Sequence, residues 1–372
     1  MSNIMKIFRS KRKASKKKRL SDESNDDDQN QTAAAGPSNR PASPPIFKLT
    51  VDCCDEIFDY WSTKDLHSFG QTCKAMQKVA GEYFKRNCAG AEKFTRDDGI
   101  YTYYYDHEGA SNKQTLTSGF NRYITNISHY YDHGRGPLRY IESHSDELDS
   151  VNNLYLVCTR LNKEKAEYFR KILPKIENLA IHQCSAWCDM FNDILKLCEN
   201  VTNLWIQDDL GDIISRKKNP WLLQNYPKLK RLHLGPRNVN EINELVSFFE
   251  RNPNVDIFST NYRCFWANRN QLMDSKAKLE TLCVEDFHYD PIGNMHEICD
   301  LLKQLHEKGF YKRLHLNFRE ISQQLCDQII LVPGLERLHF KKFNKIYSVP
   351  QMVSLKELHL PSGLKANDIQ IL

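Results

Sequence analysis

A short apolar pattern, L-x-x-L-x-L, recurs at a regular interval and constrains the fold of this chain more than any other feature. With Ile, Val, Phe or Tyr accepted for leucine, copies start at residues 124, 151, 176, 201, 229, 255, 279, 311, 335 and 355. The starts are on average about 26 residues apart, and the copies at 124 and 255 are degenerate. One such unit cannot bury its own apolar face, so stacked neighbours must build one continuous core.

The segments between the copies carry helical signals. Four apolar residues at i, i+3, i+4 and i+7 share one face of a helix, and three segments show this spacing: Phe191/Ile194/Leu195/Cys198, Ile242/Leu245/Val246/Phe249 and Ile298/Leu301/Leu302/Leu305. Proline, which ends a preceding helix because it lacks an amide donor, stands two residues before four copies: Pro174, Pro227, Pro253 and Pro333. Residues 151–372 therefore predict an α/β solenoid of strand–helix repeats with a curved parallel sheet. Its period is typical of leucine-rich repeats.

The segments before residue 151 differ in composition. Residues 1–45 are poor in apolar side chains and rich in charge, Ser, Ala and Pro, so we predict a disordered tail. Residues 46–90 predict a small helical domain. Residues 91–150 predict a linker and capping region with the first degenerate repeat, in which Tyr101, Tyr103, Tyr104 and Tyr105 favour an extended segment.

Two apolar patterns define the predicted helical domain. The first, Cys54, Ile57, Phe58 and Trp61, fits one face of a short helix. Ser62 then stands three residues before Asp65, a capping-box arrangement that starts a helix. The second pattern is a narrow helical seam: Leu66, Phe69, Cys73, Met76 and Ala80. We expect two or three packed helices, which form too small a core to stand without a partner or a docked neighbour.

This segment resembles an F-box. The F-box pattern Leu-Pro, then Ile-Phe-x-x-Leu-x-x-x-Asp-Leu, then Val-Cys-Lys-x-Trp-x-x-Leu-Ala is matched in spacing throughout residues 49–80. Thr50, Trp61 and Met76 stand where the pattern has proline, leucine and tryptophan. In the repeats, Cys184 follows Ile176-x-x-Leu179-x-Ile181, as in a cysteine-containing subclass of leucine-rich repeats. The order of the two modules is similar to that of F-box/leucine-rich-repeat proteins.

The resemblance implies a substrate receptor of a Skp–cullin–F-box ubiquitin ligase. Its helices would dock on a Skp-type adaptor and through it on a cullin, its repeats would hold a target protein, and the chain would perform no catalysis. The expected adaptor contacts are Leu49, Ile57, Phe58, Trp61, Asp65, Leu66, Phe69, Cys73 and Met76.

Side chains alternate along a strand, so the residues between the leucines are expected on the concave side of the sheet. One row begins with Asn153, Asn178 and Asn203 and continues with Arg231, Arg313 and Arg337. We hypothesise that these arginines bind an acidic or phosphorylated segment as bidentate partners. The expected target contacts are Tyr155, Trp205, Arg231, His233, Arg313, His315, Arg337 and His339.

Each of these assignments has an alternative. The arginines would belong to an ordinary solvated face if acidic neighbours cancel their charge, namely Glu280, Glu285, Glu336 and Glu357. Trp205 is expected to anchor an interface or to pack over Tyr155. His315, His339 and His359 are expected in one row, but no carboxylate accompanies them in the pattern, so we predict no metal site.

All excess positive charge lies in the tail, since residues 46–372 hold 42 basic and 42 acidic side chains. The tail contains a dense basic cluster: Lys11, Arg12, Lys13, Lys16, Lys17, Lys18 and Arg19. This cluster is either a nuclear-import signal for an import receptor or a solvated stretch that keeps the chain soluble. A neutral folded part does not favour nucleic-acid binding, although the tail alone would contact phosphates without sequence preference.

The remaining features are mostly exclusions. No apolar stretch is long enough to cross a membrane and no secretory signal is present, so we expect a nuclear or cytoplasmic protein, or both. The twelve cysteines lack zinc spacing and are expected to be buried thiols. No cofactor motif occurs. The main alternative function is a non-catalytic nuclear scaffold whose degenerate F-box does not bind the adaptor.

Overall fold

The computed structural model describes residues 49–61, 63–87, 92–96, 99–105, 111–115, 122–130, 141, 144–157, 159–161, 163–182, 184–186, 190–207, 219–235, 241–287, 295–344 and 354–359. The chain divides into two compact units, one ending at Gly90 and one beginning at Ala91. The predicted tail and its basic cluster lie outside the described residues, as does Ser62.

The first unit, called the helical unit below, contains α2 (Val51–Phe58), α3 (Thr63–Gly70) and α4 (Lys74–Asn87). Thr50 caps α2, because its side chain accepts a hydrogen bond from the Cys53 amide at 3.3 Å. The seam predicted from Leu66 to Ala80 is divided between two helices. The Thr72 amide and hydroxyl both donate to the Phe69 carbonyl, which closes the end of α3.

Side chains from all three helices form the interior of the helical unit. Phe58, Leu66, Met76 and Phe84 are buried. Polar contacts join α2 and the turn after it to α4: one guanidinium nitrogen of Arg86 lies 2.6 Å from both carboxylate oxygens of Asp55, and the Tyr83 hydroxyl donates to Asp59 at 2.6 Å. Charged hydrogen bonds of this kind stabilise a small core by about 1–3 kcal/mol each when shielded from water.

The second unit, called the repeat unit below, is built on one sheet. Within the described residues the sheet has 13 strands in the order β15-β14-β13-β12-β11-β10-β9-β7-β5-β4-β1-β2-β3. The strands are β1 (Glu92–Arg96), β2 (Gly99–Tyr105), β3 (Ser111–Thr115), β4 (Asn126–Tyr130), β5 (Asn153–Val157), β7 (Asn178–His182), β9 (Asn203–Gln207), β10 (Arg231–Leu234), β11 (Ile257–Asn261), β12 (Leu279–Phe287), β13 (Tyr311–Ser322), β14 (Leu335–Asn344) and β15 (Glu357–His359). A separate pair joins β6 (Arg160–Leu161) to β8 (Ser185–Ala186).

All neighbours from β4 to β15 in the large sheet are parallel, whereas β1, β2 and β3 form an antiparallel meander. Corresponding apolar residues pair from strand to strand and are at most 1% exposed; they are Leu154, Leu179, Leu204, Leu232, Phe258, Leu282 and Leu314. This burial confirms the predicted α/β solenoid of leucine-rich-repeat type. β2 also confirms the extended segment predicted at Tyr101–Tyr105.

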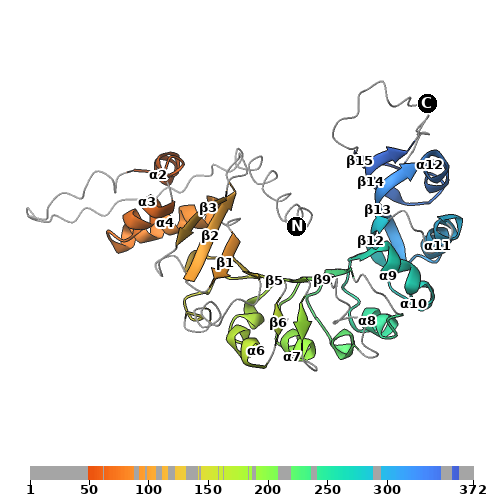
Figure 1. Cartoon of the computed structure of the whole chain (residues 1–372), viewed down its shortest axis with the longest axis horizontal. Helices are drawn as coiled ribbons and strands as arrows, with labels where there is room; N and C mark the ends of the chain where they lie inside the picture. The colour runs from red at the N-terminus through yellow and green to blue at the C-terminus, as the bar shows by residue number, and fades with distance from the viewer. Residues whose placement is uncertain are drawn as a thin grey trace, which may run out of the picture. The chain divides into compact units, whose positions relative to one another are not determined.

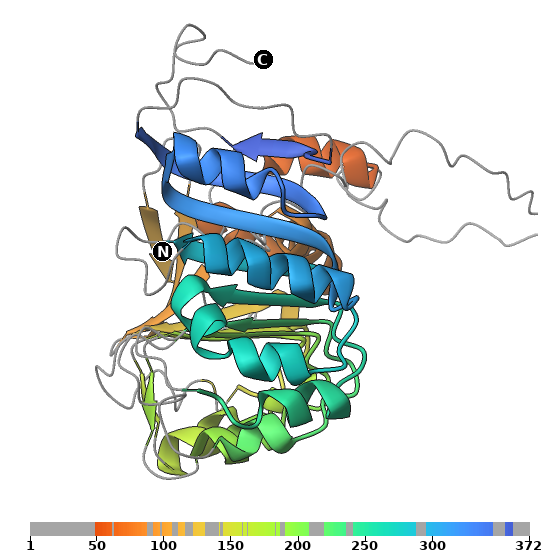
Figure 2. The same ribbon diagram turned by 90° about the vertical axis from the view of Figure 1, so that its right-hand side faces the viewer.

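Helices lie on one side of this sheet, on the outer side of its arc in Figure 1, and Figure 2 shows them stacked on the same face. They are α6 (Lys163–Phe169), η3 (Leu173–Lys175), α7 (Met190–Lys196), η4 (Pro220–Leu223), α8 (Leu245–Arg251), α9 (Tyr262–Ala267), α10 (Arg269–Asp274), α11 (Met295–Glu307) and α12 (Gln323–Ile329). The predicted apolar faces of α7 and α11 are buried. Pro253 and Pro333 follow α8 and α12, but Pro174 lies at the start of the 3-10 helix η3.

Buried asparagines link successive repeats. Asn252 accepts from the Tyr226 amide at 2.6 Å and donates to the Gln224 carbonyl at 3.1 Å. Asn268 accepts from the Ile242 amide at 2.6 Å and donates to the Cys264 carbonyl at 2.8 Å. These amides satisfy backbone groups that the turns between strand and helix would otherwise leave unpaired inside the core.

The pairing of β13 with β14 differs from the prediction. The repeat pattern places His315 beside His339, but His315 pairs with Arg337, and His339 pairs with Asn317. The register shifts between Leu314 and His315, where β14 advances by two residues, from Leu335 to Arg337. Beyond this shift Phe318 pairs with Phe340, and both are buried. The predicted row of three histidines is therefore wrong; His339 and His359 alone remain opposite each other.

Candidate binding surfaces

The helical unit exposes large apolar side chains at its start. Of the eight exposed large hydrophobic residues in the described part of the chain, five lie between residues 49 and 61. These five, called the apolar patch below, are Leu49, Val51, Ile57, Tyr60 and Trp61; Tyr60 is 90% exposed and the others 36–53%. Exposed apolar residues scattered along a chain are ordinary, whereas five within thirteen residues of sequence on a small domain favour an interaction site.

A cluster of aromatic rings packs against Trp61, one residue of the apolar patch. Phe58 contacts Trp61, Phe69 and Tyr83 at ring-centroid distances of 5.2, 5.4 and 5.2 Å. Trp61 also contacts Phe69 at 5.2 Å. The half-exposed indole thus rests on rings fixed by the interior, so it offers a preorganised apolar surface.

The predicted adaptor contacts fall into two groups. Leu49, Ile57, Trp61, Asp65 and Cys73 are exposed, and Phe69 is half-buried. Phe58, Leu66 and Met76 belong to the interior of the unit. The helical spacing in the sequence did not identify Val51 and Tyr60 as exposed apolar residues. Val51 lies two residues after Leu49, and Tyr60 lies three residues after Ile57, so their closeness in sequence to predicted contacts could have indicated them.

On the repeat unit, the sheet face opposite the helices is called the open face below. It carries a ladder of asparagine side chains across β4, β5, β7 and β9. Asn153 donates to Asn126 Oδ1 at 2.5 Å, Asn178 donates to Asn153 Oδ1 at 2.5 Å, and Asn203 donates to Asn178 Oδ1. Each amide donates toward the preceding repeat, so the ladder has a direction and locks the register of four strands.

Trp205 and His233 lie one row further along the open face, on β9 and β10. Their rings stack at a centroid distance of 3.5 Å and an interplanar angle of 7°. Gly235 makes this arrangement possible, because a Cβ at residue 235 would lie 2.8 Å from His233 Nε2. His233 is only 6% exposed, which differs from the solvent-facing position predicted for it. Burial lowers the pKa of His233 to about 3.

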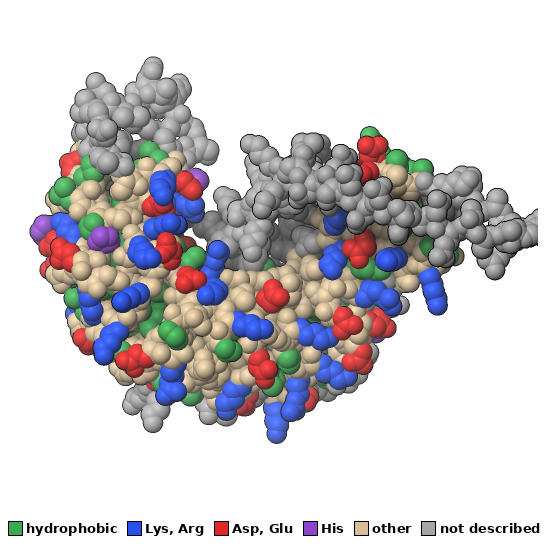
Figure 3. Space-filling view, turned by 180° about the vertical axis from the view of Figure 1, so that it is seen from behind, with side chains coloured by type: hydrophobic (Ala, Val, Ile, Leu, Met, Phe, Trp, Pro, Cys, Tyr) green, Lys and Arg blue, Asp and Glu red, His purple; other side chains and the backbone are tan. Residues whose placement is uncertain are grey.

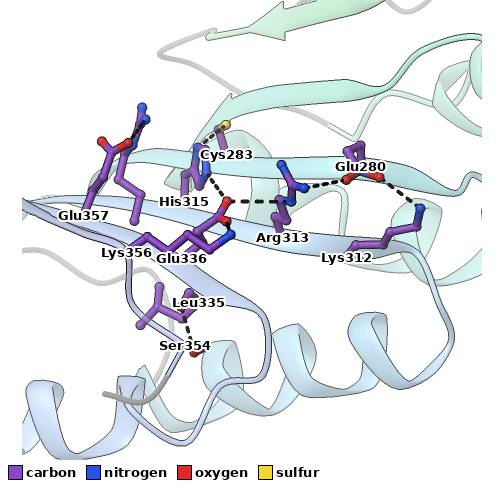
Figure 4. Close-up of polar contacts among 11 residues, drawn as sticks. Glu280, Cys283, Lys312, Arg313, His315, Leu335, Glu336, Ser354, Lys356 and Glu357 are labelled. Atoms are coloured by element: carbon purple, nitrogen blue, oxygen red, sulfur yellow. Dashed lines mark hydrogen bonds and ion pairs between the residues drawn. The ribbon is translucent and has the colours of Figure 1, made fainter. Parts of the chain in front are cut away.

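The later repeats carry a network of ion pairs centred on Glu336. Its carboxylate contacts Lys356, lies 3.5 Å from His315 Nε2 and lies 3.8 Å from Arg313 Nε (Figure 4). Glu280 pairs with Lys312 at 3.0 Å and with Arg313 at 3.3 Å. Arg337 pairs with Glu357 at 2.8 Å, and Glu357 also lies 3.2 Å from His359. Arg313 and Arg337 therefore lie in a charge-balanced surface.

These contacts shift the pKa of each carboxyl group in the network. Hydrogen bonds from Lys312, Lys356 and Arg337 lower the pKa of Glu280, Glu336 and Glu357, respectively. Burial, with the nearby charge of Arg337, lowers the pKa of His315. His315 is thus held close to a carboxylate while its own protonation is disfavoured.

Cys283 lies at the inner end of the same network, with its Sγ 3.7 Å from His315 Nδ1. Burial raises the pKa of this thiol to about 11, so at neutral pH it is a protonated thiol beside an imidazole. Nine described cysteines are free thiols, of which Cys53 and Cys73 are exposed and Cys283 is half-buried. The expectation of buried thiols therefore fails for these three.

Arg231 differs from the other two predicted arginines. It is exposed, and it makes no ion pair with a residue that the structure describes. Its register partner on β9 is Asn203, so it stands where a fifth asparagine would continue the ladder. Tyr155 lies two residues after Asn153 on β5 and is half-buried.

Charges of both signs are mixed on the face that Figure 3 shows. Figure 3 shows Lys and Arg side chains interspersed with Asp and Glu on the face in view, in agreement with the balanced charge of residues 46–372. Among the described residues, no group of three or more His, Cys, Asp and Glu side chains is arranged to hold a metal ion. In that same part of the chain, no helix has both the length and the apolar character needed to cross a membrane.

The register, the burial and the strand–helix alternation define the repeat unit as an α/β solenoid of leucine-rich-repeat type. No protein-family model matches the sequence, and no curated protein matches it either. A leucine-rich-repeat-containing protein, LegL7 from Legionella pneumophila, resembles the chain at 13% identity and a TM-score of 0.36, over 59% of this chain and 83% of that one. The crystal structure of the Rad7 and Elc1 complex in yeast resembles it at 11% identity and a TM-score of 0.43, over 87% and 90%. Both TM-scores lie below 0.5, so the fold assignment rests on this chain's own strand pairing.

Proposed function

We propose that this chain is the substrate-recognition subunit of a Skp–cullin–F-box ubiquitin ligase. The helical unit would bind a Skp-type adaptor, and through it a cullin, while the open face of the repeats would hold a target protein. The chemistry of ubiquitin transfer would belong to other subunits, and this chain would act by positioning the target.

The apolar patch is the observation that carries the proposal. A folded unit of this size gains from covering Leu49, Val51, Ile57 and Trp61, because apolar burial drives protein association. The aromatic rings beneath Trp61 keep the surface in place before a partner arrives, so little conformational entropy is lost on binding. The resemblance of residues 49–80 to an F-box, placed before leucine-rich repeats, supports a Skp-type adaptor as that partner.

Co-purification of the full chain with a Skp-type adaptor tests the proposal. The informative variant is Val51→Asp combined with Ile57→Asp, because both side chains are exposed and their loss leaves the interior intact. Leu66 and Met76 are unsuitable, since they are 2% and 6% exposed and an aspartate there would disrupt the core. Lys85→Asp is the matched control: it places an acidic side chain at an exposed position of α4, outside the patch.

We expect the wild type and the Lys85→Asp variant to retain the adaptor and the double variant to lose it, with unchanged thermal melting of all three. If the wild type does not bind a Skp-type adaptor, the ligase role is wrong. The chain would then be a scaffold whose helical unit serves another partner. Equal binding by the double variant would show that the adaptor docks elsewhere on the chain.

A further inference from the structure

Charge is distributed unevenly along the open face. Two central rows can be followed from β5 to β12 by strand register. The ladder row holds Asn153, Asn178, Asn203, Arg231, Ile257 and Thr281, and the stacking row holds Tyr155, Ala180, Trp205, His233, Ser259 and Cys283. Neither row contains a carboxylate. Arg231 is the only cation among these described residues, because burial keeps His233 neutral.

Among the described residues, no ion pair engages the Arg231 guanidinium. Asp256, the residue before the register partner of Arg231 on β11, is engaged by Lys230 at 3.6 Å. Arg313 and Arg337, in contrast, already lie against Glu280 and Glu357. An incoming carboxylate would have to displace those glutamates at the later repeats, whereas it meets no competing carboxylate in the two rows around Arg231.

The asparagine ladder ends at Asn203 on β9, the register partner of Arg231. The amide nitrogen of Asn203 donates to Asn178 Oδ1 and to Thr202 Oγ1, so both of its hydrogens are used. Continued by one strand, the ladder would set Asn203 Oδ1 on the side of β10, the strand that carries Arg231. A guanidinium has five N–H donors in a rigid fork. One acceptor on Asn203 therefore leaves enough donors for a bidentate contact with a partner.

Trp205 adds a second contact at a defined spacing. It lies on β9 two residues after Asn203, the register partner of Arg231, so Arg231 and Trp205 are diagonal neighbours about 7–8 Å apart. Alternate residues of an extended peptide point to the same side about 6.6 Å apart. A peptide with a carboxylate at one position and a flat apolar side chain two residues away matches this diagonal.

We propose that an acidic, extended segment of a partner protein docks at Arg231 and Trp205, with an Asp or Glu paired to the guanidinium and an aromatic or large apolar side chain on the indole. This inference rests on the proposed function in assigning the open face to the target, and it names the chemistry of that target. It places the acidic contact at Arg231 and not at Arg313 or Arg337.

A selection from a displayed library of random dodecapeptides on the immobilised full chain tests this assignment. We expect the selected peptides to be enriched in Asp or Glu two residues from an aromatic or large apolar residue. Loss of the charged hydrogen bonds in Arg231→Gln should weaken binding of the selected peptides by about tenfold or more. Arg231→Glu should select basic peptides instead. Arg313→Gln is the matched control and should change affinity by less than about twofold.

Several outcomes would overturn the assignment: no selected peptides, peptides without acidic enrichment, or unchanged affinity in Arg231→Gln with a weakened Arg313→Gln variant. Displacement of the peptides by an oligothymidine strand at equal concentration would also overturn it, because the site would then accept any anionic backbone. The Val51→Asp, Ile57→Asp variant separates this test from the ligase role. It should lose the adaptor and still select acidic peptides.

Discussion

Trp205 and His233 stack face to face across β9 and β10, with their ring centroids 3.5 Å apart. Burial lowers the pKa of His233 to about 3, so the imidazole is neutral over the physiological range and packs as a flat aromatic ring. Protonating it would place a charge in the interior without a compensating partner. The stack therefore couples the stability of the central repeats to pH.

The stability of the repeat unit should fall with acidification between pH 6.5 and about 3. The pKa of His233 is lower in the folded chain than the ordinary value of 6.5, so the unfolded chain binds the extra proton in this range. The stabilisation that neutral His233 contributes is fully present above pH 6.5 and is lost as pH falls. The free energy of unfolding should decrease by at most about 1.4 kcal/mol per pH unit. Urea unfolding at pH 7, 6, 5 and 4 measures the slope.

His233→Phe is the control for that experiment, because phenylalanine keeps a ring against Trp205 but does not titrate. The free energies of unfolding of the variant and the wild type should diverge as pH falls, in favour of the variant. Parallel pH profiles of the two proteins would show that His233 is accessible to protons in the folded state and would contradict its buried position.

The asparagine ladder makes a separate prediction about stability. Asn178 stands inside it, donating to Asn153 and accepting from Asn203. Asn178→Ala should lower the free energy of unfolding by about 2 kcal/mol, because it leaves an acceptor and a donor without their partners. Asn254 donates once, to the Pro227 carbonyl, at an exposed position, so Asn254→Ala should cost about 0.5 kcal/mol or less. Equal losses in a denaturant titration would mean that the ladder contributes no more than a surface contact.

The sequence predicts the solenoid well because its period is encoded in buried residues. Leu154, Leu179 and Leu204 fall in one register, and each must be apolar to fill the space between sheet and helices. The pairing of β13 with β14 is not visible in the same pattern, because the additional apolar residue Phe318 allows a second register that also pairs apolar residues with one another. A period of apolar residues determines which face is buried, but it does not decide between two registers that differ by two residues.

The candidate sites depend on side-chain partners, and these were only partly visible in the sequence. The alternation rule correctly places Asn153, Asn178 and Asn203 in one row, but it does not show that they bond to each other. Three of the four glutamates considered as charge-cancelling neighbours contact the predicted arginines: Glu280 and Glu336 contact Arg313, and Glu357 contacts Arg337. Strand register decides which glutamate meets which arginine. The exposure of Val51 and Tyr60 follows from how α2 packs on α4, which sequence spacing does not determine.

The ion-pair network predicts local acid sensitivity at the end of the repeat unit. Contacts with Lys356, His315 and Arg313 lower the pKa of Glu336 below its ordinary value of 4.5. As pH falls, Glu336 is therefore protonated in the unfolded chain before it is protonated in the folded chain. The stabilisation from its carboxylate is complete above pH 4.5 and is lost as pH falls through the lower pKa of the folded state.

Glu336→Gln should mimic that loss at pH 7. Hydrogen exchange of the amides in β13, β14 and β15 should quicken by about fivefold, corresponding to about 1 kcal/mol, since the network is partly open to solvent. Glu307→Gln, at an exposed position at the end of α11, should leave the same amides unchanged. The difference between the wild type and Glu336→Gln should shrink as pH falls below 4.5, and a difference that does not change with pH would rule out the carboxylate charge as the source.

Cys283 should react slowly with alkylating reagents even though it is half-buried and lies 3.7 Å from His315. Burial raises the pKa of its thiol to about 11, so its thiolate fraction at pH 7.5 is smaller than that of free cysteine by about two orders of magnitude. Mass spectrometry of iodoacetamide-treated full chain should show a rate that rises about tenfold from pH 7.5 to 8.5, because both values lie below the thiol pKa. His315→Phe should leave that rate unchanged within about twofold if burial alone protects the thiol. A rate that is already level above pH 8 and drops in His315→Phe would instead show that the imidazole withdraws the thiol proton.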